Sequence, residues 1–103
     1  MESKRGRLEI ARDILKVARG GAGITAIVYG ANLNFPIAKK HIQEMEGAGL
    51  ITVRVLPGSG NKLFTTTGWG HEFMSSLERT LAMYERMTHP LRPEEPAQEV
   101  TDA

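Results

Sequence analysis

The stretch ITAIVYGANLNFPIAKKHIQEMEGAGLI, residues 24–51, decides the fold of this chain. It indicates two short helices joined by a tight turn, followed by a glycine-rich exit into a strand. The first helix is predicted at about Thr25–Ala31, with Thr25 as its N-cap. The second is predicted at about Phe35–Ala48, because Asn34 is a good N-cap and the proline that follows loses no hydrogen bond in a first helical turn.

The residues before this stretch predict a supporting helix at about Arg7–Arg19. Its apolar side chains recur every three or four residues and form one stripe. The members of the stripe are Leu8, Ala11, Ile14, Leu15 and Ala18. The glycine-rich segment at residues 20–23 ends the helix, since glycine adopts the left-handed conformation at a helix exit without a steric penalty.

A β-hairpin is predicted after the second of the paired helices. Leu50–Leu56 alternates in polarity and is rich in β-branched residues, which favours a strand. Residues 57–61 (PGSGN) form a turn cluster. Lys62–Thr66 is then the returning strand.

The last predicted helix, Gly68–Thr88, has Thr67 as its N-cap. An apolar stripe runs along it and consists of Phe73, Leu77, Leu81, Tyr84 and Met87. A helix of this length extends for about 30 Å, which is more than three shorter helices can cover. We therefore expect the stripe to be exposed at its far end and to pack against a second copy of the chain.

The fold predicted from these elements is mostly α-helical with a small β-hairpin. It divides the chain into a flexible basic N-terminus (1–6), a helical domain with the hairpin (7–67), a coiled-coil-type dimerisation helix (68–88) and a disordered acidic tail (89–103).

Composition and charge limit the function classes. With 103 residues, the chain forms one domain at most, and it has no cysteine for disulfides or thiolate metal sites. The net charge of +1 conceals an asymmetry, since residues 1–88 carry +4 and residues 89–103 carry −3. No apolar run approaches the length of a membrane span. We therefore expect an intracellular, cytoplasmic protein whose basic body permits nucleic-acid binding.

Three segments in this order resemble a known family. They are RLEIARDIL at residues 7–15, the stretch at residues 24–51, and FTTTGWGHEF at residues 64–73. Together they resemble the archaeal winged helix-turn-helix family of small DNA-binding proteins, over about residues 7–88. That family contains chromatin-associated proteins that dimerise through a long C-terminal helix in an antiparallel coiled coil. The resemblance implies double-stranded DNA as a partner and a homodimer.

In a helix-turn-helix, the second of the paired helices enters the major groove of DNA. Lys39 and Lys40 are then predicted to meet phosphates or guanine edges, and Gln43 to read adenine. The alternative is that these lysines form an ordinary solvated face, and Glu44 and Glu46 on the same helix would repel phosphates. The predicted contacts from this region are Asn34, Pro36, Ile37, Lys39, Lys40 and Gln43.

Basic residues outside this helix extend the predicted interface. Arg54 and Lys62 lie in the hairpin, which has no acidic residue between Leu50 and Thr67. Across the paired strands they are expected to flank a minor groove or a row of phosphates, and Arg5 and Arg7 to add a mobile basic arm. The alternative for the hairpin is ordinary edge-strand charge that blocks aggregation.

The sequence favours a dimeric, nucleoid-associated or regulatory DNA-binding protein. It leaves open a winged-helix module that binds proteins and not DNA, since Glu44, Glu46 and the modest net charge are compatible with that function. No catalytic constellation, metal-ligand set or cofactor motif is present in the sequence, so an enzyme is not expected. The sequence identifies neither a target site nor a small-molecule effector.

Overall fold

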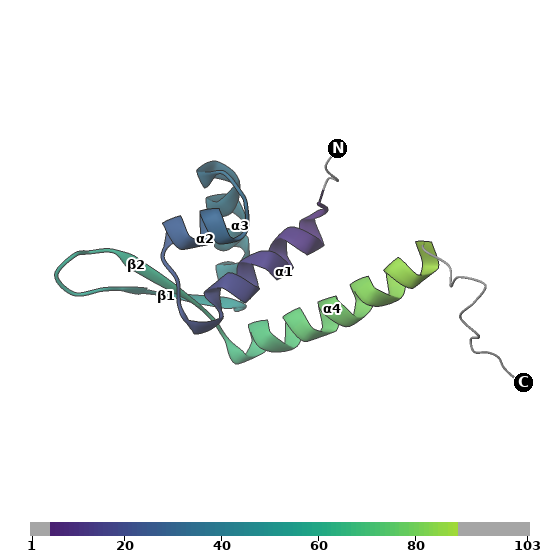
Figure 1. The fold of residues 1–103 in the computed structure, drawn as a ribbon. Helices are drawn as coiled ribbons and strands as arrows, with labels where there is room; N and C mark the ends of the chain where they lie inside the picture. Colours follow the sequence, from purple (N-terminus) through teal and green to yellow (C-terminus); the bar gives the residue numbers. More distant parts are fainter. Residues whose placement is uncertain (1–4, 89–103) are drawn as a thin grey trace, which may run out of the picture.

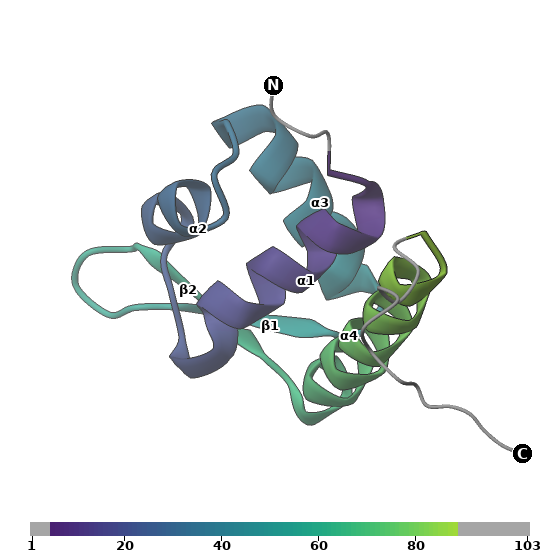
Figure 2. The same ribbon diagram turned by 45° about the vertical axis from the view of Figure 1, so that its right-hand side comes forward.

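The computed structural model describes residues 5–88 and contains the predicted elements in the predicted order. The elements are α1 (Arg7–Val17), α2 (Ile24–Gly30), α3 (Phe35–Gly47), β1 (Ile51–Val55), β2 (Lys62–Thr66) and α4 (Gly68–Thr88). Figures 1 and 2 show the hairpin and the far end of α4 on opposite sides of the molecule. The acidic tail and most of the predicted N-terminal arm lie outside the described residues.

The first two helices have boundaries that differ from the predicted ones. The α-helix α1 ends at Val17, and Ala18–Gly20 tightens into a 3-10 turn. Helix α2 begins at Ile24, because Gly23 is extended and its carbonyl accepts the first helical hydrogen bond, from Ile27 N–H at 3.1 Å. Thr25 therefore lies inside the first turn, and its predicted role as N-cap is wrong.

The tight turn between α2 and α3 is a Schellman-type exit. Asn32 takes a left-handed conformation with φ 57°, and the N–H of Leu33 donates to the carbonyl of Val28 at 2.8 Å. This bond satisfies a carbonyl that the helix end leaves open. Asn34 then starts α3, and its Oδ1 accepts from the N–H of Ile37 at 2.9 Å. The predicted N-cap role of Asn34 is confirmed.

Helix α3 ends in the same Schellman-type motif. It ends at Gly47, one residue earlier than predicted, and Gly49 takes φ 82°. The N–H of Leu50 donates back to the carbonyl of Met45 at 2.9 Å, and both side chains are buried in the core. Because Leu50 closes the helix, β1 begins only at Ile51, and it is one residue shorter at each end than predicted.

The hairpin is anchored to the segment between α1 and α2. The antiparallel register pairs Ile51 with Thr66 and Val55 with Lys62. On the other edge of β2, Phe64 exchanges two backbone hydrogen bonds with Ala22, each at 2.8 Å. This bridge places the start of α2 beside the hairpin.

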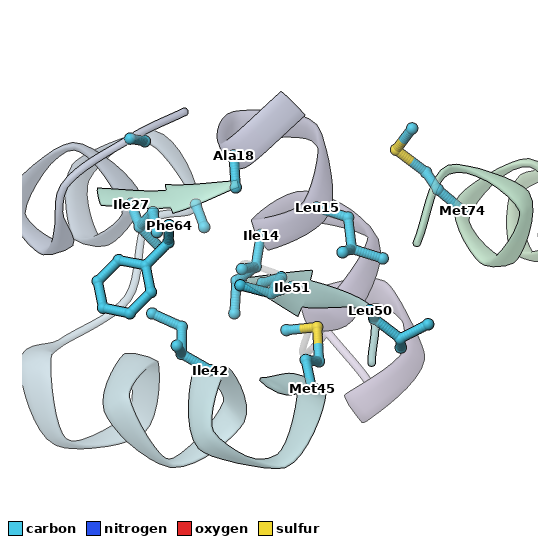
Figure 3. Packing of buried hydrophobic residues seen from close by; sticks show 12 residues of the cluster. Ile14, Leu15, Ala18, Ile27, Ile42, Met45, Leu50, Ile51, Phe64 and Met74 are labelled. Atoms are coloured by element: carbon cyan, nitrogen blue, oxygen red, sulfur yellow. The ribbon is translucent and has the colours of Figure 1, made fainter. Parts of the chain in front are cut away.

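One hydrophobic core joins the helices to the hairpin (Figure 3). Its side chains come from every element and include Ile14, Leu15, Ile27, Ile42, Met45, Ile51, Phe64 and Met74. Thr66 is buried among them, and its hydroxyl donates to the carbonyl of Leu15 at 2.8 Å. This hydrogen bond satisfies a polar group that would otherwise destabilise the core.

The junction between β2 and α4 depends on a close approach. Thr67 Oγ1 accepts from the N–H of Gly70 at 2.9 Å, which confirms the predicted N-cap, and donates to the carbonyl of Gly49 at 2.7 Å. A Cβ added to Gly70 would lie 2.3 Å from the carbonyl oxygen of Leu50. Only glycine therefore permits α4 to start so close to the exit of α3.

The apolar stripe of α4 divides into two parts. Leu77 is buried within the single chain and Phe73 packs against its core. Leu81 is half-buried, whereas Tyr84 and Met87 are 58% and 72% exposed. The expectation that the stripe is exposed at its far end is therefore confirmed, whereas its near end completes the core of the domain.

Candidate nucleic-acid interface

Helix α3 separates a buried face from an exposed one. Ala38, Ile42 and Met45 form the buried face. At about 100° per residue, Lys40 lies nearly opposite this face, with Gln43 beside it. All residues predicted to contact DNA from this region occupy exposed positions: Asn34, Pro36, Ile37, Lys39, Lys40 and Gln43.

One edge of α3 is turned toward the start of α1. There the guanidinium of Arg7 donates to Glu44 Oε1 at 3.1 Å, and the two side chains are 74% and 44% exposed. The pair neutralises one of the two acids that weakened the DNA hypothesis. The pair is largely solvated, so it contributes little to stability.

Arg5 does not belong to a mobile arm. Its guanidinium donates to Asp13 Oδ2 at 2.6 Å, to the carbonyl of Ala31 at 2.7 Å and to the carbonyl of Asn32 at 2.8 Å. These contacts hold the residue against α1 and the turn that precedes α3. The prediction that Arg5 belongs to a mobile arm is therefore wrong, because three of its five N–H donors are held inside the domain.

The two hairpin bases do not act side by side. Arg54 is paired with Leu63, and Lys62 with Val55. Since directly opposed residues share one face of a hairpin and neighbours alternate, Arg54 and Lys62 lie on opposite faces. Lys62 shares its face with the buried Phe64. Opposite faces do not fit the expectation of a single phosphate row beside both bases, whereas the alternative, that they flank a minor groove, stays a prediction.

A groove lies between α2, the start of α3 and the hairpin, with a volume of about 550 Å³. Lys39 from α3 and Lys62 from β2 both line it. Further lining comes from Ile24, Thr25, Phe35, Asn61 and Phe64. Sequence reasoning missed these five, since only the bridge between Ala22 and Phe64 brings α2 beside the hairpin, and no local pattern announces that bridge.

Two further findings apply to residues 5–88. No helix in this range is long and apolar enough to cross a membrane. No group of three or more histidine, aspartate or glutamate side chains in this range is placed to hold a metal ion.

Comparison with solved structures finds the same fold in DNA-associated proteins. Sso10a-2, a DNA-binding protein from Sulfolobus solfataricus, is 26% identical, with a TM-score of 0.78 over 82% of this chain and 86% of its own. BpsR from Bordetella bronchiseptica is 16% identical, with a TM-score of 0.69 over 90% of this chain and 72% of its own. The transcriptional regulator PcaV from Streptomyces coelicolor is 19% identical, with a TM-score of 0.70 over 91% and 67%. The last two show the fold alone.

A search of curated protein sequences finds no match to this chain. The family model described as winged helix-turn-helix matches residues 4–85, which is most of the chain. It covers the paired helices, the hairpin and all but the end of α4. The chain therefore belongs to the winged helix-turn-helix family.

Proposed function

We propose that the chain is a dimeric DNA-binding protein, either a transcription regulator or a nucleoid-associated protein. Helix α3 enters the major groove, and the β1–β2 hairpin contacts the backbone or the neighbouring minor groove. The observation that carries this proposal is the exposed face of α3, with Lys39, Lys40 and Gln43, beside a hairpin that has bases and no acid. Family membership and the similarity to a DNA-binding Sulfolobus protein support it.

Several exposed residues of α3 and its N-cap have specific roles in this proposal. Lys40 faces the floor of the DNA major groove and donates to a guanine edge or a phosphate. Gln43 forms a two-pronged hydrogen bond with adenine. Ile37, which is 42% exposed, touches a thymine methyl group. At the helix start, Pro36 packs on the DNA backbone. The side-chain NH2 of Asn34 donates to a phosphate, since its side-chain oxygen is already engaged in the cap.

The hairpin contributes bases on both of its faces. Lys62 faces the groove beside α3, whereas Arg54 projects from the other face. A hairpin that enters a minor groove has one phosphate row on either side, so bases on opposite faces serve opposite rows. Arg7 adds a contact from the start of α1.

The dimer forms through the far end of α4. Leu81, Tyr84 and Met87 retain exposed apolar surface there, and Met83 beside them is 68% exposed. Phe73 and Leu77 support this surface from within the domain. A second copy of α4 covers the exposed part and joins two DNA-binding surfaces in one particle.

A salt series of duplex binding tests the DNA function. Fluorescence anisotropy with a short duplex is expected to give an affinity that falls steeply with salt. The Lys40→Glu variant should lose at least tenfold in affinity, because it places a negative charge opposite the phosphates. Arg79→Glu, a matched charge reversal on α4 away from α3, should bind nearly as wild type does.

Two outcomes contradict the proposal. Equal losses for the two variants would show that α3 is not the reading element. Absence of duplex binding by a folded wild-type protein at low salt would leave the winged-helix protein-interaction module as the function of this fold.

A further inference from the structure

The larger groove between α3 and the hairpin concentrates positive charge, and no acidic residue lines it. Lys39 and Lys62 come from different elements and both line the 550 Å³ groove. Within residues 5–88, neither lysine forms an ion pair, although four other ion pairs occur there. Two ammonium groups at one hollow repel each other, and an anion between them removes that repulsion.

A neighbouring acid limits where the anion can lie. A smaller hollow of about 120 Å³ also has Lys39 and Lys62 in its lining, but Gln43 and Glu46 line it as well. Glu46 does not line the larger groove. The carboxylate of Glu46 therefore excludes an anion from the smaller hollow. The larger groove, toward α2 and the hairpin tip, stays available to an anion.

The larger groove also has an apolar part in its lining. Phe35, Phe64 and Ile24 line it together with the two lysines. Phe64 is buried and fixed in the core, whereas Phe35 is 45% exposed. A free inorganic anion gains no binding energy from apolar side chains, whereas the sugar of a nucleotide presents carbon atoms that pack against them.

We propose that Lys39 and Lys62 jointly hold one phosphate of a single DNA strand, with the adjoining deoxyribose against the apolar side chains that line the same groove. This inference rests on the proposed function and specifies how one strand is held. If α3 occupies a major groove and the hairpin the next minor groove, the strand that separates the two grooves crosses the space between these elements. That space is the groove shared by Lys39 and Lys62. Arg54, on the opposite face of the hairpin, serves the other side.

The salt dependence of duplex affinity measures how many phosphates the lysines serve. Each neutralised phosphate contributes a slope of about −0.9 to the plot of log affinity against log salt. If one phosphate is shared, the remaining lysine still neutralises it in Lys39→Gln or Lys62→Gln. On a duplex short enough for only one DNA-binding surface, each single variant should then reduce the slope by less than about 0.9, and the double variant by about 0.9 in total.

Three controls complete the experiment. Lys39→Arg and Lys62→Arg keep the charge and should retain the wild-type slope. The pair Lys39→Gln and Lys40→Gln should show simple addition of the two single effects, because Lys40 faces away from the groove and does not share its phosphate. All of these lysines are exposed, so the variants should fold as wild type does.

The contrary results are distinct. On this short duplex, a double variant Lys39→Gln/Lys62→Gln that loses about 1.8 in slope would assign the lysines to two phosphates. No change in slope would remove them from the interface. Either result overturns the proposal of one shared phosphate, while DNA binding by the wild-type protein stands. A wild-type protein without salt-dependent duplex binding would overturn both the shared phosphate and the proposed function.

Discussion

Arg5 joins three parts of the chain that are far apart in the sequence. Its guanidinium contacts the side chain of Asp13 on α1 and the carbonyls of Ala31 and Asn32 at the end of α2. Asp13 also accepts from Arg12 at 3.1 Å, so two arginines share this carboxylate. A cation at the carboxyl end of a helix satisfies open carbonyls and interacts favourably with the helix dipole. Arg5 thus fixes the turn from which α3 starts.

Replacement of Arg5 should therefore destabilise the domain. The Arg5→Gln variant is expected to lower the free energy of unfolding by about 1–2 kcal/mol, since it removes hydrogen bonds from a charged donor in a half-buried site. The unfolding free energy of Arg5→Lys should fall between those of wild type and Arg5→Gln, because an ammonium cannot reach all three acceptors. Urea unfolding at a fixed protein concentration measures the difference, since a dimer makes stability depend on concentration.

Arg7 provides the matched control for this measurement. It is two residues away, also basic, and forms a pair with Glu44 that is largely solvated. Arg7→Gln should change the unfolding free energy much less than Arg5→Gln does. Equal losses would mean that general charge at the N-terminus, and not the three contacts of Arg5, stabilises the fold.

These residue contacts mark where sequence reasoning ends. Asn34 and Thr67 were predictable as N-caps because a cap bonds within three residues of itself. Arg5 was not, because its carbonyl partners lie 26 and 27 residues along the chain. Arg54 and Lys62 were assigned correctly to the hairpin, but the sequence left their relation open, since their faces depend on a register that composition does not specify.

At the scale of elements, helix α4 serves two purposes along one stripe. Its first half completes the core through Met74 and Leu77, and its second half leaves Tyr84 and Met87 exposed. The bounds of α4 were predictable from a capping threonine and a regular apolar period. The exposed far end was also predictable from the length of α4, but the residue at which the cover stops was not, because it depends on how far α1 extends beside α4 (Figure 1).

The exposed half of α4 predicts a dimer that one substitution disrupts. Tyr84→Asp should shift the protein from dimer to monomer at micromolar concentration, because it places a charge in an apolar interface. Tyr84 makes no contribution to the core of the single chain, so the monomer should remain folded. Ser75→Asp, on the opposite side of the helix, is the matched control. Sedimentation equilibrium distinguishes the states, and a wild-type monomer would contradict the prediction.

At the scale of the whole molecule, the two proposed surfaces do not compete for space. The hairpin and the far end of α4 lie on opposite sides of the domain (Figure 1). A dimer joined through α4 therefore leaves α3 and the hairpin of both copies accessible. Two such surfaces on one particle raise the affinity for DNA when both reach the same duplex, because the second contact becomes intramolecular.

This arrangement makes the salt dependence a measure of how many copies engage one duplex. Each copy contributes its own phosphate contacts, so a dimer that binds one duplex with both surfaces should show about twice the slope of a monomer. Wild type and the monomeric Tyr84→Asp variant should thus differ about twofold in slope on a duplex long enough for both surfaces. On a duplex shortened to one surface, their slopes should become equal. Equal slopes on the long duplex as well would mean that the two surfaces of a dimer hold separate duplexes, and wild type should then bridge them.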